Sequence, residues 1–65
     1  MIDRKELTII LVKKLQNEVE ELSSYIDFLN SIDDFVGKTD LINVSRDLID
    51  ILTIRIDTLK TSVNN

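Results

Sequence analysis

The chain has 65 residues, a net charge of −4 and 43% hydrophobic residues. It contains no cysteine and no histidine, which excludes disulfide bonds, thiolate metal sites and the side chain that most often acts as a general base. A single domain this short buries little surface on folding, so oligomerisation is the remaining way to stabilise it.

The first periodic stretch predicts a helix over about 4–33. Asp3 is followed three residues later by Glu6, which is the spacing of a capping box at a helix start. The next apolar residues recur in alternating steps of three and four, as in a helix that packs along a heptad seam. They are Val12, Leu15, Val19, Leu22, Ile26 and Leu29. Asp33 falls on the same side, so we expect regular packing to stop there.

The break between the two stretches centres on Gly37, the only glycine in a chain without proline. Glycine readily takes the left-handed conformation that ends helices, so we expect Gly37 to end the first helix. The predicted turn covers about 34–39. Thr39 or Asp40 can cap the second helix, predicted over about 40–62.

The second stretch repeats every seven residues, as in Asp40-Leu41-Ile42-Asn43 and Asp47-Leu48-Ile49-Asp50. Its apolar residues cover an arc of roughly 180°, nearly twice what packing on one neighbouring helix needs. The sequence therefore predicts an all-α fold for residues 1–65. This fold is an antiparallel two-helix hairpin whose excess apolar surface must be covered by another molecule. We expect two hairpins to dimerise into a four-helix bundle, or one hairpin to dock on a different protein. The predicted self-association or partner interface consists of Ile42, Ile49, Leu52, Ile56, Leu59 and Val63.

Two smaller features complete the candidate contacts. Glu18 and Arg55 are charges on the apolar arcs of their helices, and in a hairpin turning near Gly37 they face each other. Such an ion pair would fix the register of the helices, although each side chain can instead reach solvent at the edge of its arc. The residues Ile10, Phe28 and Ile32 form a thinner strip, which is either a second contact surface or scattered surface apolars.

No pattern in the chain predicts chemistry, so we expect no catalytic, cofactor-binding or metal-binding residue and no enzyme activity. The serines have no histidine to activate them, and there is no glycine-rich phosphate loop. Asp47 and Asp50 lie on a row opposite the apolar arc, which favours a solvated face over a metal site. That row could also offer an acidic surface to a basic partner.

The leading hypothesis is a non-enzymatic protein–protein interaction module, a small regulator or inhibitor that binds itself as a homodimer and another protein. A structural or scaffolding bundle is an alternative. A nucleic-acid-binding regulator is another, similar to the Rop family of plasmid copy-number regulators in size and shape only. The basic residues of this chain that could serve such a function, Arg4, Lys5, Lys13 and Lys14, are interspersed with glutamates and form a poor phosphate track.

The acidic balance and the short apolar run Leu7–Val12 favour neither nucleic-acid binding nor membrane association. That run is also too short for a signal-peptide core, so we expect a cytoplasmic protein. Many isoleucines, asparagines and aspartates, without alanine or proline, suggest an AT-rich coding sequence of a low-GC bacterium or its phage.

Overall fold

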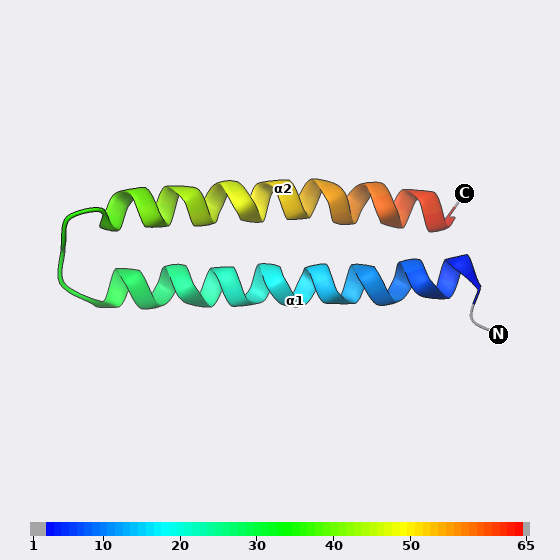
Figure 1. The fold of residues 1–65 in the computed structure, drawn as a ribbon, viewed down its shortest axis with the longest axis horizontal. Helices are drawn as coiled ribbons and strands as arrows, with labels where there is room; N and C mark the ends of the chain where they lie inside the picture. Colours follow the sequence, from blue (N-terminus) through cyan, green and yellow to red (C-terminus); the bar gives the residue numbers. More distant parts are fainter. Residues whose placement is uncertain (1–2, 65) are drawn as a thin grey trace.

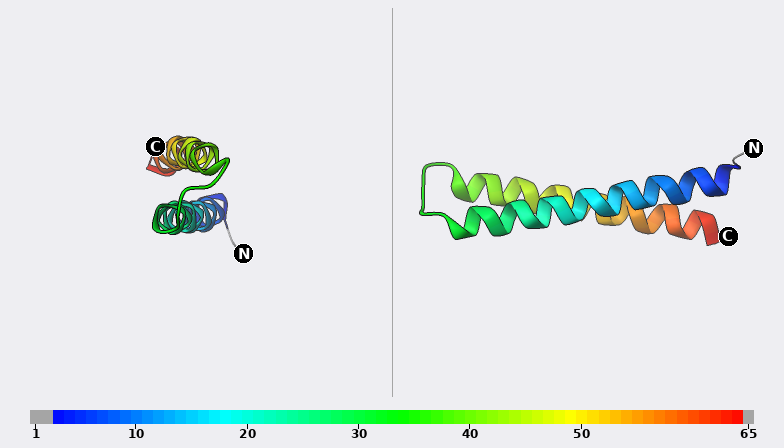
Figure 2. Two further views of the ribbon diagram at one scale, coloured as in Figure 1. Left: turned by 90° about the vertical axis from the view of Figure 1, so that its left-hand side faces the viewer. Right: turned by 90° about the horizontal axis from the view of Figure 1, so that it is seen from below.

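The computed structural model describes residues 3–64 and confirms the predicted all-α hairpin. Helix α1 (Arg4–Ser31) and helix α2 (Lys38–Asn64) run antiparallel along their whole length, with the turn at one end and both termini at the other (Figure 1). Seen from below, the two helices cross at a shallow angle near the middle (Figure 2). The hairpin measures 50 × 18 × 12 Å, so it is one helix thick in its thinnest direction.

Asp3 caps the start of α1, as the sequence predicts. Its carboxylate accepts a hydrogen bond from the backbone N–H of Glu6 at 2.9 Å. Its carbonyl accepts the first helical hydrogen bond, from the N–H of Leu7, at 3.1 Å. The side-chain bond thereby satisfies one of the four N–H groups that a helix start leaves unpaired.

The first helix ends two residues earlier than predicted, at Ser31 rather than at residue 33. Ile32 already has an extended backbone, with φ −102° and ψ 158°. A continued helix would carry Asp33 into the seam between the helices, where an unpaired carboxylate is costly. The connection therefore covers residues 32–37 instead of 34–39.

The predicted role of Gly37 is wrong in one respect. Gly37 does have a positive φ, +91°, but its carbonyl accepts the hydrogen bond of the Leu41 N–H at 3.0 Å, so it starts α2 and does not end α1. Thr39 and Asp40 consequently lie inside the first turn of α2, and the helix extends to Asn64 rather than to residue 62. The left-handed residue is needed where the extended connection turns into the second helix.

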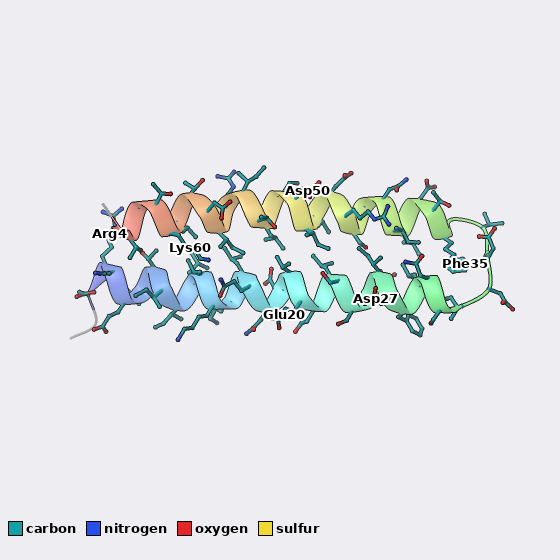
Figure 3. The ribbon with its side chains drawn as sticks, turned by 180° about the vertical axis from the view of Figure 1, so that it is seen from behind. Arg4, Glu20, Asp27, Phe35, Asp50 and Lys60 are labelled. Carbon is teal, nitrogen blue, oxygen red and sulfur yellow. The ribbon has the colours of Figure 1, made fainter. Side chains whose placement is uncertain are left out.

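Lys38 ties the turn to the end of α1. Its ammonium group donates a hydrogen bond to the carbonyl of Ile32 at 2.7 Å, and its backbone N–H donates to the carbonyl of Phe35 at 3.1 Å. The last turn of α1 has no basic residue of its own, so Lys38 places a positive charge near the negative end of that helix dipole. Phe35 turns inward from the connection (Figure 3), whereas Val36 is fully exposed.

Replacing Gly37 by alanine tests the backbone requirement of this turn. No atom lies within 4 Å of an added Cβ, so the substitution has no steric cost against the rest of the chain. Its cost is the left-handed backbone itself, and we expect Gly37→Ala to lower the free energy of unfolding by about 1–2 kcal/mol. Urea unfolding followed by circular dichroism measures this loss. Gly37→Asn is the control and should lose less, because asparagine tolerates this conformation better.

The interior of the hairpin is a single seam between the helices. Apart from the half-buried Gln16, its buried and half-buried residues recur in steps of three and four in both helices. Counting from the turn pairs them in successive layers. The layers are Leu29 with Ile42, Ile26 with Ser45, Leu22 with Ile49, Val19 with Leu52, Leu15 with Ile56, Val12 with Leu59, and Thr8 with Val63. The buried seam residues are Val12, Ile26, Leu29, Ser45 and Ile56, and among the described residues no side chain is less than 2% exposed.

Candidate protein interaction face

One face of the hairpin is defined by the residues that immediately precede a seam residue. In each helix these residues lie about 100° around the axis from the seam. Because the helices are antiparallel, the residues that precede seam residues in α1 and those that do so in α2 lie on the same face of the hairpin. A surface groove confirms the geometry, since Glu18 and Glu21 of α1 line it together with Leu48 and Ile51 of α2.

The half of this face nearest the turn is apolar except for Glu21, which precedes the seam residue Leu22. Tyr25 and Phe28 of α1 precede the seam residues Ile26 and Leu29, and four residues of α2 do the same on the other helix. All of them are exposed, and Phe28, Val44 and Ile51 by more than half of their surface. We call this set the turn-side patch; it consists of Tyr25, Phe28, Leu41, Val44, Leu48 and Ile51.

The other half of the same face, nearer the termini, is mainly polar. Its apolar members are Leu7 and Leu11, which are exposed near the start of α1. The remaining positions that precede seam residues carry charges or hydroxyl groups. They are Lys14, Glu18, Arg55, Thr58 and Ser62.

The opposite face of the hairpin consists of the residues that follow a seam residue, and only Ile9 among them is apolar. Glu20, Asp27 and Asp50 belong to it, and Glu20 and Asp50 point away from the other helix (Figure 3). Lys60 lies between the two helices in the same view and lines a groove with Lys5 and Lys13. The hairpin therefore has one side with an apolar patch and one polar side.

The exposed surface of the hairpin is larger than its mass requires. It exposes 5214 Å², whereas a compact monomer of 7.5 kDa exposes about 4200 Å². The difference of roughly 1000 Å² is similar to the area, about 800 Å², that one partner contributes to a stable protein–protein interface. The hairpin thus has spare surface on the scale of one interface.

The predicted interface residues of α2 lie mostly inside the hairpin. Ile56 is buried against α1, and the other five, Ile42, Ile49, Leu52, Leu59 and Val63, are half-buried in the same seam. Their first contact is therefore with α1 of the same chain, and their part in self-association stays a prediction. The exposed residues of the wide apolar arc are the ones that belong to the turn-side patch, and they are 42–57% exposed.

Glu18 and Arg55 are both exposed and lie on the face that carries the turn-side patch. None of the side-chain hydrogen bonds formed by residues 3–64 joins them. The register ion pair is thus not formed as a hydrogen bond, and its role in setting the register stays a prediction.

The residues of the predicted second contact surface, Ile10, Phe28 and Ile32, are all exposed. Ile10 lies about 27 Å along the helix from Phe28, which is too far for one contiguous patch with it. Phe28 instead belongs with Tyr25 and with the exposed residues of α2. Leu41, Val44 and Leu48 belong to the predicted apolar arc of the second helix, but the sequence analysis did not predict them as contact residues. Each directly precedes a seam position, and this spacing could have marked them as the exposed edge of the arc.

Ser45 is the polar residue that the sequence analysis did not place in the interior. It is 5% exposed and occupies the layer of Ile26. Its hydroxyl donates to the carbonyl of Leu41 at 2.8 Å, so the buried donor is satisfied within α2. This hydrogen bond explains how the hydroxyl of Ser45 can be buried, so no catalytic role is needed to account for it.

Residues 3–64 bring no three histidine, cysteine, aspartate or glutamate side chains together in a way that could hold a metal ion. Within the same part of the chain, neither helix has the length and apolar character needed to cross a membrane. Fold and surface together define the class of the protein, an antiparallel helical hairpin with one apolar patch. Comparison with known proteins finds no matching family model, curated protein or solved structure.

Proposed function

We propose that this protein is a non-enzymatic protein–protein interaction module, a small regulator that acts through its helical surface. The observation that carries the proposal is the turn-side patch, six exposed apolar side chains from two helices on one face. Soluble monomers rarely expose contiguous apolar patches of this kind unless the patch is a binding site. The patch includes Tyr25 and Phe28, and aromatic residues are enriched in the centres of interfaces.

A module of this kind regulates by covering a surface of its partner. Beside the patch lie Glu18 and Glu21, with Lys14 and Arg55 further toward the termini. Charged groups at the rim of an interface select partners with complementary charges more than they add affinity. The absence of cysteine is compatible with a reducing compartment such as the cytoplasm, where we place the protein.

The test compares two matched glutamate substitutions in α2. Val44 is 57% exposed and lies in the turn-side patch, whereas Ile54 is 65% exposed and lies on the outer side of the helix. A partner isolated with the native chain is purified, and its binding to each variant is measured by calorimetry. We expect Val44→Glu to weaken binding by at least about 30-fold and Ile54→Glu by less than about 3-fold. Equal effects of the two substitutions would contradict the proposal.

A second candidate function, nucleic-acid binding, is supported by the polar side of the hairpin. Lys5 and Lys13 of α1 and Lys60 of α2 line one groove there, so both helices contribute positive charge to one place. Binding through phosphates would weaken steeply as salt rises. Retention of RNA or DNA at low salt, lost in a Lys13→Ala, Lys60→Ala double variant, would favour this function over the first. No retention at low salt would eliminate it.

A further inference from the structure

We propose that the turn-side patch is covered by a second copy of the chain, packed face to face with both turns at the same end. The inference rests on the proposed function and names the occupant of that face. It follows from three properties of the face, namely its area, the way its apolar residues are divided between the helices, and the position of its charges.

The area matches one copy of the hairpin. The surface excess of roughly 1000 Å² over a compact monomer is close to the share of about 800 Å² that each partner buries in a stable complex. Covering one face with an identical hairpin produces a four-helix bundle in which each helix has two neighbours. The thin seam, which has no side chain below 2% exposure within residues 3–64, then becomes part of a thicker core.

The orientation follows from the uneven distribution of apolar residues along the face. A two-fold axis parallel to the helices lays α1 of one copy on α2 of the other, with the turns together. Tyr25 and Phe28 then lie at the same height as Val44 and Leu48 of the second copy. Because the axis repeats each contact, Tyr25, Phe28, Leu41 and Val44 are covered by apolar side chains of the other copy, whereas Leu48 and Ile51 have Glu21 of the other copy beside them.

The opposite orientation, with the turns at opposite ends, covers the patch poorly. When the hairpins overlap along their whole length, it lays each helix on the same helix of the second copy in the reverse direction. Tyr25 and Phe28 then meet the apolar Leu11 and Leu7, but Leu48 and Ile51 face the terminal half of α2, where the positions at matching heights are Thr58 and Arg55. Apolar side chains would meet a hydroxyl and a guanidinium group, and the buried charge would have to be compensated.

The charges of the face fit the first orientation. When the turns are together, Glu18 of one copy lies at a height between Ile51 and Arg55 of the other. Arg55 lies at a height midway between Lys14 and Glu18 of the other copy, and it can pair with the glutamate at the edge of the apolar contact. Such a pair adds specificity to the orientation more than it adds stability.

The orientation is tested with spin labels, because the chain has no cysteine of its own and accepts single labelled cysteines cleanly. In Asp34→Cys the label sits in the turn. With the turns together, the two labels of a dimer should lie less than about 30 Å apart, the width of a small bundle. A distance near 50 Å, the length of the hairpin, would overturn the orientation. Asn17→Cys, at the middle of α1, is the control, because its label distance depends little on orientation.

The occupant is tested by sedimentation over a dilution series, with Val44→Glu and Ile54→Glu as the matched pair. We expect a dimer whose dissociation constant rises about 100-fold in Val44→Glu, since the two-fold axis places the change in the interface twice. Ile54→Glu should change it by less than about 3-fold. Oligomers that keep growing with concentration, or a dimer unaffected by Val44→Glu, would overturn the inference.

A second measurement, on Tyr25 in the unaltered chain, tests the inference even if the Val44→Glu variant unfolds. Tyr25 is the only tyrosine in a chain without tryptophan, and it is 40% exposed in the single hairpin. Acrylamide quenching of its fluorescence in the unaltered chain should increase on dilution as the second copy leaves. A folded monomer at all concentrations would overturn the second copy while leaving the proposed function intact, because the patch would then be free for another protein.

Discussion

Leu29→Ala is expected to lower the free energy of unfolding by about 2–5 kcal/mol, a large fraction of the stability of a domain this small. Leu29 is the most buried side chain of the hairpin, at 3% exposure, and it pairs with Ile42 in the layer next to the turn. Removing three carbons there leaves a cavity that two helices fixed by a short turn cannot close. Urea unfolding followed by helical circular dichroism, at one fixed chain concentration, measures the loss.

The control for this prediction is Ile54→Ala. Ile54 is exposed and contributes to neither the seam nor the turn-side patch, so its removal should change stability by no more than about 0.5 kcal/mol. Equal losses in the two variants would mean that the seam is not the source of stability, and the layered interior described for the hairpin would be wrong.

Ile26→Ser is expected to destabilise the protein by about 3–5 kcal/mol, and a second substitution should recover most of the loss. Ile26 shares its layer with Ser45, so the single variant leaves two serines facing each other. Ser45→Ile alone overpacks the layer and should cost about 1–3 kcal/mol. The double variant exchanges the two side chains across the same layer and restores its volume.

The double variant tests the register of the two helices. If Ile26 and Ser45 share a layer, the double variant should be less stable than the native chain by no more than about 2 kcal/mol. That loss is much smaller than the sum of the losses in the two single variants. Thermal unfolding of the four proteins at equal concentration provides the comparison. Simple additivity of the two losses would show that the helices pair in another register.

The local features of the fold could be predicted from the sequence, because they depend on residues close together in the chain. The steps of three and four between apolar residues predicted both helices, since only a helix brings such residues to one side. The spacing of Asp3 and Glu6 predicted the start of α1, and the structure shows the hydrogen bond that it implies. The single glycine located the turn to within two residues.

The exact turn required the three-dimensional structure. Gly37 has the predicted left-handed backbone, but whether it ends one helix or starts the next depends on the path between the helix ends. That path begins with an extended backbone at Ile32 and has no regular secondary structure over residues 33–35, and Lys38 bonds back to Ile32 across it. A hydrogen bond such as the one between Lys38 and Ile32 joins the ends of two helices, and the distance between these ends is known only once the helices are packed against each other.

The sequence by itself determined that the second helix has more apolar surface than one neighbour can cover, because the arc follows from helical geometry and residue type alone. Only the tertiary structure decided which half of that arc is covered. Docking on α1 buries Ile56 and even the polar Ser45, while Leu48 and Val44 stay exposed. The physical reason is that packing on one neighbour covers only a stripe of about 100° of α2, and the position of that stripe is set by the turn and by the seam of α1.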